Sequence, residues 1–253
     1  EGYDSYLWST GETTQTIEVT ETGDYIVEVE NIYSNNFSLS FNEPDNFRIV
    51  EFEASEELNI SGDLTIMMDI AMWISPGNNN PGWQHIMGHG QFSENSSDNQ
   101  QYFLQSPPGS LNVLYLHEYN SGENEEVLFN IEDIVEWDEW YHLTIVRNTE
   151  NNTIQCYING NLILEEVYTY NPSNGENGLL SFGNIINPSP NIYDDNFNGN
   201  LDNISIWNTA LIEEEIQLYS NCPLSGNEDG LIGAWNFEEG SGIIANDLTD
   251  NQN

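Results

Sequence analysis

The sequence contains no lysine, and its only two basic residues are Arg48 and Arg147. Against these stand 43 Asp and Glu residues, which gives a formal net charge of −41 at pH 7. Nucleic acids and anionic membrane surfaces are bound through positive charge, so this composition excludes them as expected partners. Self-repulsion of this size is tolerated where salt or divalent cations screen it. The charge balance therefore predicts an extracellular protein in a saline environment.

Cysteine is also scarce, with only Cys156 and Cys222. Strand alternation groups Cys156 with Ile154 and Ile158, so we expect it to be a buried free thiol. For Cys222, pairing with a cysteine outside this chain and a bridge to Cys156 both stay open. No secretory leader and no long apolar run that would span a membrane is visible. The cysteines by themselves leave the redox compartment open.

High net charge combined with low hydrophobicity is typical of disordered chains. Here 12% of the residues are aromatic, and many segments alternate between apolar and polar residues. The clearest is 64–74, whose even positions are all Leu, Ile or Met and are expected to face a core, with Asp69 on the opposite face. Further strands are predicted near 84–89, 101–106, 111–118, 126–131, 140–147, 153–159, 161–167, 178–184 and 201–207. A spacing of about 8–12 residues with Gly, Asn and Pro turns predicts an all-β, two-sheet antiparallel jelly-roll sandwich.

One stretch combines a turn, a strand and the only predicted helix. The residues 197–216 read as a Gly-containing turn, a strand over 201–207 and a short helix over 211–219. Regular alternation places Asp202 on the same face as Ile204 and Ile206, where a core is expected. A buried carboxylate needs an ionic partner or several hydrogen bonds. Because the chain offers only two arginines, a bound cation is a candidate partner.

The same stretch carries a resemblance to a known family. It follows the pattern F-x-G-x-L-D-N-I-x-I-W-N-x-A-L-x-x-x-E-I, which resembles the end of laminin-G-like, pentraxin-like domains of the concanavalin A-like lectin/glucanase superfamily. Three further segments fit that family in the same order: 38–50, 58–73 and 140–160. The resemblance covers roughly residues 37–220 and implies a concanavalin A-like sandwich with one short helix near the C-terminus.

The chain is expected to hold more than this one domain. Residues 1–31 contain three short alternating strands and resemble the C-terminal part of an Ig-like or PKD-like repeat of bacterial surface proteins. The laminin-G-like domain is predicted over 37–253. Within it, 230–253 resembles the family's first strand, displaced to the end of the chain. A circular permutation, with this strand beside 201–207, is favoured, and the start of a following repeat is the alternative.

Oxygen-bearing side chains gather between residues 187 and 202. Hard oxygen donors of this kind suit calcium, so we predict a calcium site with Asp202, Asp194, Asp195 and Asn200 as ligands. The resemblance likewise implies a structural calcium near Asp202. The alternative is an acidic loop in which Asp202 accepts hydrogen bonds from backbone amides.

Aromatic residues suggest a ligand surface. Alternation over 111–119 places Tyr115, His117 and Tyr119 on one face, and together with Trp83 they are the candidate ligand-binding residues. Exposed rings of this kind stack on sugars. Further candidate rings are Tyr102, Tyr168 and Tyr170. The alternative is that some of these rings belong to the core.

Catalysis has little support in the sequence. The segment 51–56 loosely resembles the E-x-D-x-x-E motif of laminarinase-like glycosidases, but Glu53 stands where that motif has Asp. We therefore expect a non-catalytic extracellular adhesion or carbohydrate-binding module of a multidomain bacterial surface protein. Its partner would be a glycan or another surface protein. The alternatives are an endo-acting glycoside hydrolase and a passive spacer in a surface fibre, packed against neighbouring copies in a repeat array.

Overall fold

The computed structural model describes residues 5–14, 16–20, 22–30, 37–41, 49–73, 83–90, 101–120, 123–169, 172, 178–184 and 196–253. The chain divides into two units, Glu1–Asn36 and Phe37–Asn253. In the first unit, β1 (Ser5–Trp8) pairs antiparallel with β2 (Val27–Glu30). These are the two strands among its described residues, where the sequence predicts three.

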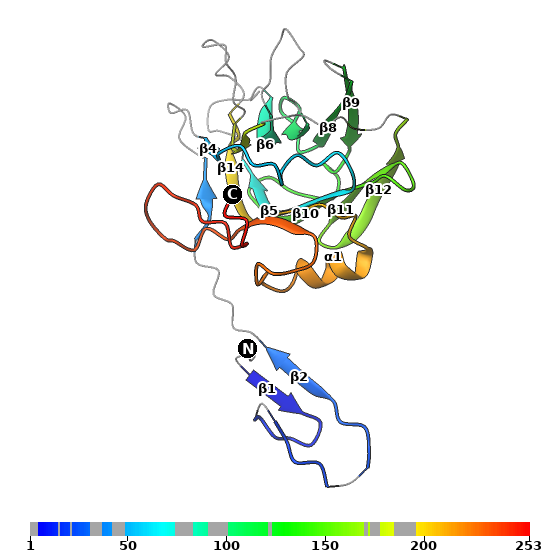
Figure 1. Cartoon of the computed structure of the whole chain (residues 1–253), viewed down its shortest axis with the longest axis vertical. Coiled ribbons are helices and arrows are strands. Elements are labelled where there is room, and N and C mark those ends of the chain that lie inside the picture. Colours follow the sequence, from blue (N-terminus) through cyan, green and yellow to red (C-terminus); the bar gives the residue numbers. More distant parts are fainter. Residues whose placement is uncertain are drawn as a thin grey trace. The chain divides into compact units, whose positions relative to one another are not determined.

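The second unit contains two antiparallel sheets (Figure 1). Among the described residues, the larger sheet has seven strands in the order β12-β11-β10-β5-β14-β15, with β3 also pairing with β14. Their bounds are β3 (Leu39–Ser40), β5 (Leu64–Met72), β10 (Tyr141–Asn148), β11 (Thr153–Ile158), β12 (Asn161–Val167), β14 (Gly199–Trp207) and β15 (Leu231–Trp235).

The smaller sheet has six strands within the described part of the chain, in the order β4-β13-β6-β7-β8-β9. Their bounds are β4 (Val50–Glu51), β6 (Gln84–His89), β7 (Tyr102–Ser106), β8 (Val113–Asn120), β9 (Glu123–Phe129) and β13 (Leu180–Phe182).

The main core lies between the two sheets. The even-numbered residues of β5 all belong to this core, as their alternation predicts, and Asp69 faces the other side of the sheet. Aromatic residues from several strands fill the space between the sheets, for example Phe52 packed edge-on against Phe182 with ring centroids 5.0 Å apart. The architecture agrees with the all-β jelly-roll sandwich that the sequence predicts.

The outer face of the seven-stranded sheet carries a second apolar cluster under the helix α1 (Glu213–Tyr219). Three glutamates occupy the first turn of α1, where the helix dipole favours acidic residues. Ile216 of the helix is buried in this cluster, and Tyr219 stacks on Trp207 of β14 at 4.8 Å. The segment that follows β14 therefore covers this part of the outer face.

The C-terminal segment forms part of this domain. Strand β15 pairs antiparallel with β14, so it occupies the place that a circularly permuted first strand would take. The outer edge of β15 is covered by the chain's last residues, because Ala234 N donates to Asp247 Oδ1 at 2.9 Å and Ala234 O accepts from Leu248 N at 2.8 Å. An edge strand covered in this way offers fewer free backbone groups to another chain.

Both cysteines are free, with Cys156 buried and Cys222 exposed. The predicted buried thiol at Cys156 is confirmed, and the alternative of a bridge between the two is wrong. Burial raises the pKa of the Cys156 thiol to about 12, so it stays protonated and unreactive at neutral pH. None of the described helices is long and apolar enough to cross a membrane.

Candidate functional site

Asp202 lies beside a β-bulge in β14 that reverses the face expected for it. Leu201 and Ile204 both point into the main core, although they are three residues apart. The register with β5 shifts after Asp202, and Asn203 has a positive φ of 45°. Asp202 therefore faces the outer side of the seven-stranded sheet, opposite Asp69 of β5. The prediction that Asp202 shares a face with Ile204 is wrong, because simple alternation takes no account of the extra residue.

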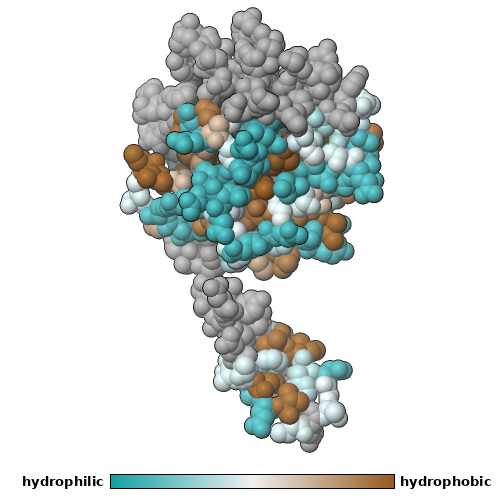
Figure 2. Space-filling model, in the orientation of Figure 1, coloured by the Kyte–Doolittle hydropathy of each residue, from teal (hydrophilic) through white to brown (hydrophobic). Residues whose placement is uncertain are grey.

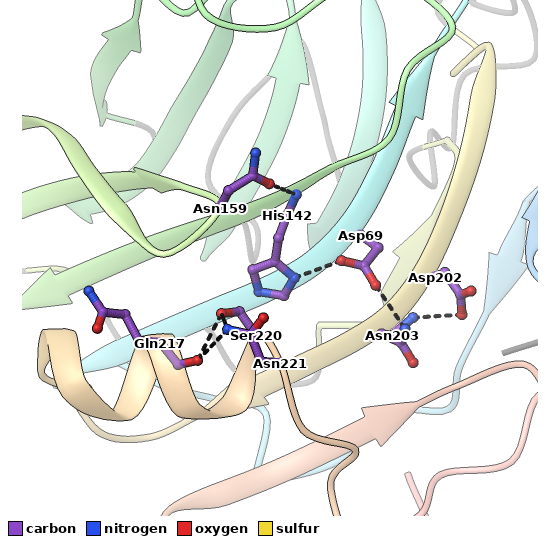
Figure 3. Close-up of polar contacts among 8 residues, drawn as sticks. All are labelled: Asp69, His142, Asn159, Asp202, Asn203, Gln217, Ser220 and Asn221. Carbon is purple, nitrogen blue, oxygen red and sulfur yellow. Dashed lines mark hydrogen bonds and ion pairs between the residues drawn. The ribbon is translucent and has the colours of Figure 1, made fainter. Parts of the chain in front are cut away.

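A row of polar residues crosses three strands on this outer face (Figure 3). His142 of β10 is the cross-strand partner of Asp69, which is in turn the partner of Asp202. Asp69 Oδ1 lies 2.7 Å from His142 Nδ1, and Asp69 Oδ2 accepts a hydrogen bond from Asn203 Nδ2 at 2.8 Å. Asp202 Oδ1 accepts from the backbone N–H of Asn203 at 2.8 Å. This last contact agrees with the alternative in which a backbone amide holds Asp202.

The imidazole of His142 is oriented by Asp69 but closed off from solvent. His142 is buried, and its backbone N–H donates to Asn159 Oδ1 at 2.9 Å. Its Nε2 is buried and has no hydrogen-bond partner among the described residues. A carboxylate that holds a histidine in this way would suit a base or a metal ligand. Because Nε2 is enclosed, the pair acts here as a structural link between β5 and β10.

Two of the four predicted calcium ligands lie within the described residues. Asn200 and Asp202 are two positions apart on the same face of β14. Asp194 and Asp195 lie outside the described residues. Among the residues that the structure describes, no group of three or more His, Cys, Asp or Glu side chains is placed to hold a metal ion. The calcium site therefore stays a prediction.

The aromatic candidates separate into surface and core. Trp83, immediately before β6, is 38% exposed. Tyr115 is completely buried between the sheets, so the prediction that its ring is a surface sugar contact is wrong. The backbone of His117 and Tyr119 belongs to β8, and their side chains lie outside the described part of the structure. Of the further candidates, Tyr102 and Tyr168 are buried in the core and Tyr170 lies outside the described residues.

A buried arginine explains why Tyr115 is in the core. Arg147 is fully buried, and its Nη1 donates to the Tyr115 hydroxyl at 3.2 Å. Its Nε donates to Gly62 O at 2.9 Å and its Nη2 to Ile60 O at 2.5 Å. Burial raises the pKa of the Tyr115 hydroxyl, and the charge of Arg147 offsets part of that rise. Arg147 and the residues that it contacts are far apart in the sequence, so no local sequence pattern predicts this contact.

Near the start of β6 lies a group of amide side chains that the sequence analysis missed. Gln84 is the first residue of β6, and its Oε1 accepts from the backbone N–H of Asn198 at 3.0 Å. Asn184 donates a side-chain hydrogen bond to Asn196, which forms a β-bridge with His85. Gln84 and Asn184 are buried, whereas Asn196 and Asn198 are half-buried. We call Gln84, Asn184, Asn196 and Asn198 the amide cluster.

The comparisons with known proteins identify the family. A laminin-G family model described as Concanavalin A-like lectin/glucanases superfamily matches residues 46–217. The chain belongs to this superfamily. The resemblance on which the predicted fold rested is thereby confirmed, whereas the Ig-like repeat preceding the domain stays a prediction. A comparison with curated protein sequences finds no match.

Solved structures share the superfamily fold at low sequence identity. A SAP-like pentraxin from Limulus polyphemus has 15% identity and a TM-score of 0.53, over 83% of this chain and 90% of the pentraxin. A candidate carbohydrate-binding protein from Bacteroides ovatus ATCC 8483 has 16% identity and a TM-score of 0.56, over 93% of this chain and 62% of that one. The binding domain of botulinum neurotoxin DC in complex with SialylT has 20% identity and a TM-score of 0.52, over 74% of this chain and 42% of that one. At these identities the likeness shows the fold.

The superfamily includes glucanases, so the carboxylates of the glycosidase-like segment 51–56 are candidates for catalysis. Glu51 lies on β4, the edge strand of the six-stranded sheet, and Glu53 follows it. Both side chains are exposed. Glycosidases use one carboxylic acid whose pKa is raised by burial in an enclosed site. Two exposed acids at a sheet edge do not provide that environment.

An apolar groove of about 650 Å³ opens at another edge of the sandwich. It lies between the segment Phe37–Phe41, the start of β4 and the loop 239–245. Ile243 and Ile244 of this loop are 101% and 72% exposed. Figure 2 shows hydrophobic residues at the left margin of the larger unit, where Figure 1 draws the C-terminal segment in red, and mostly hydrophilic residues over the rest of its described surface in this view.

Proposed function

We propose that this chain is a non-catalytic, extracellular binding module that recognises a glycan through Trp83 and the amide cluster. A single observation carries the proposal: Trp83 is exposed immediately before β6, where the neighbouring Gln84 accepts a hydrogen bond from the half-buried Asn198. An indole ring stacks on the apolar face of a sugar ring. Amides supply both donors and acceptors, which match hydroxyl groups.

The superfamily membership supports this proposal, because lectins are among its members. The Bacteroides ovatus neighbour is itself a candidate carbohydrate-binding protein. The same fold also carries enzymes and spacers, so the fold alone does not decide the function. The exposed position of Glu51 and Glu53 favours binding over hydrolysis. We further propose that the module belongs to a multidomain surface protein, preceded by the end of an Ig-like repeat.

We also propose that calcium binds near Asp202. Asn200 and Asp202 would contribute oxygens from the outer face of β14, with Asp194 and Asp195 supplying the remaining ligands. The net charge of −41 favours the binding of divalent cations at such a group of oxygens.

A glycan array tests the binding function. The wild-type chain and Trp83→Ala are applied in parallel, with Trp140→Ala as the matched control. Trp140 is 48% exposed and lies just before β10 of the other sheet. Glycans retained by wild type and Trp140→Ala but lost by Trp83→Ala would support the proposal. Binding that survives Trp83→Ala would contradict the site, and release of reducing sugar that disappears in Glu51→Gln would contradict the non-catalytic function.

A further inference from the structure

We infer that the ligand of the proposed glycan site is uncharged, so that at low ionic strength anionic polysaccharides bind this protein more weakly than neutral ones unless divalent cations are added. The inference rests on the proposed function and names the class of glycan. It follows from where the fold places the few side chains that can carry positive charge.

Arginine is one possible source of positive charge for a ligand site. Of the two in the chain, Arg147 is fully buried, and three of its N–H groups are used by Ile60 O, Gly62 O and the Tyr115 hydroxyl. A guanidinium held in this way between the sheets has no donor left on the surface for a ligand. Arg48 lies outside the described residues. One arginine at most is therefore available to a carboxylate or sulfate group of a ligand.

Histidine is a second possible source of positive charge. Three of the four, His85, His89 and His142, are buried. Burial lowers the pKa of His89 to about 4, so this imidazole is neutral at neutral pH. His142 lies on β10 of the other sheet, with its Nδ1 2.7 Å from Asp69 Oδ1. Within the described residues, no exposed histidine supplies a cation near Trp83.

Anionic glycans require positive charge in their binding site. Carboxylates and sulfates are recognised by arginine or lysine, or through a metal ion. Here the protein carries a net charge of −41, which repels an anionic chain at low ionic strength and does so less as salt screens it. Among the described residues, the segment bound to the start of β6 instead carries the uncharged amides Asn196 and Asn198, both half-buried. Amides and an indole ring match a neutral sugar, whose hydroxyls donate and accept without charge.

The experiment compares neutral polysaccharides with their own charged derivatives. The probes are a soluble β-glucan, a galactan and a mannan, each beside its carboxymethylated form. Affinity gel electrophoresis and calorimetry measure binding at 50 and 500 mM NaCl in EDTA. We expect at least one neutral polysaccharide to bind with less than a twofold change between the two salt concentrations. Its carboxymethylated form should bind at least tenfold more weakly at 50 mM, with the gap closing at 500 mM.

The remaining outcomes separate failure of this inference from failure of the proposed function. Equal or tighter binding of the carboxymethylated form at 50 mM NaCl in EDTA would overturn the inference and leave glycan binding intact. If Arg48→Gln then abolished that binding, the cation would be identified. Recovery of binding by the carboxymethylated form at 50 mM NaCl when calcium replaces EDTA would support the inference, because the metal then supplies the positive charge. Absence of binding by every probe, neutral and charged, would overturn the proposed function and this inference with it.

Discussion

Arg147 on β10 and Tyr115 on β8 join the two sheets from within, through a hydrogen bond from Nη1 to the tyrosine hydroxyl at 3.2 Å. The same guanidinium binds two backbone carbonyls of the segment before β5, at Ile60 and Gly62. A buried charge is tolerated when its donors are satisfied in this way. The contact takes both an aromatic ring and a cation away from the surface, and this limits the ligands that the surface can bind.

Replacing Arg147 by methionine should destabilise the domain strongly. The substitution leaves the Ile60 and Gly62 carbonyls and the Tyr115 hydroxyl without their donor, so we expect a loss of at least about 3 kcal/mol in the free energy of unfolding. Tyr115→Phe removes only one hydrogen bond and should cost about 1 kcal/mol. Urea unfolding followed by tryptophan fluorescence measures both. Equal losses in the two variants would show that the carbonyl contacts contribute nothing.

Replacing Asp69 by alanine tests the polar row on the outer face. His142 Nδ1 and Asn203 Nδ2 both lose their partner, and we expect a loss of about 1–3 kcal/mol. Glu139→Ala is the control, because Glu139 is exposed and its substitution removes the same unit of negative charge. A surface change of this kind is expected to stay within about 0.5 kcal/mol. If both variants unfold at the same urea concentration, the row does not hold the strands together.

The buried imidazole of His89 should make stability fall in acid. Burial lowers its pKa from 6.5 to about 4 in the folded protein. As pH falls below about 6.5, His89 therefore takes up a proton in the unfolded chain but stays neutral in the folded protein. This contribution is fully present above pH 6.5 and is lost progressively towards pH 4, by up to about 3 kcal/mol.

The test for His89 compares wild type with His89→Gln between pH 8 and pH 4. The free energy of unfolding of wild type minus that of His89→Gln should decrease as pH falls. The contributions of the carboxylates are common to both proteins and cancel in this difference. His142→Gln serves as the control. Because it retains His89, it should still show the acid-dependent loss of stability that comes from His89. A difference between wild type and His89→Gln that is constant with pH would contradict the prediction.

Removing the C-terminal strand should unfold or strongly destabilise the domain. Trp235 of β15 is buried against Phe52 and Phe182, with ring centroids 4.9 and 5.3 Å away. Trp235→Ala should cost about 3–5 kcal/mol, and truncation after Asn227 should cost more because it also removes the edge strand. Ile243→Ala, on a fully exposed side chain, is the control. A truncated chain with an unchanged melting temperature would show that this segment belongs to a different domain.

Calcium should raise the melting temperature if the proposed site exists. Binding to the folded state adds about 2.7 kcal/mol at a hundredfold excess over Kd. Asp202→Asn should remove most of this gain at fixed ionic strength. Magnesium is the control, because it demands a tighter octahedral geometry and releases its waters reluctantly. If calcium shifts wild type and Asp202→Asn equally, or magnesium serves as well, the effect is a general neutralisation of charge.

The sequence by itself determined the elements whose cause is local. The even positions of β5 are apolar, and they face the core because consecutive residues of a strand point to opposite sides. The hairpin at Asn159 and Gly160 was predictable as well, since both residues adopt the positive φ that an Asn-Gly turn requires, 50° and 73°. Together with the family pattern over 197–216, these features were enough to predict a sandwich.

Only the tertiary structure decided which faces and rings are available to a ligand. Asp202 faces outward because a bulge at Asn203 interrupts the alternation of β14, and the bulge depends on the register with β5. Tyr115 is inside because an arginine from the opposite sheet reaches its hydroxyl. The alternation of a strand separates its two faces but does not say what covers each one. That depends on contacts between segments far apart in the chain, which is why Trp83 is left at the surface while Tyr115 is buried.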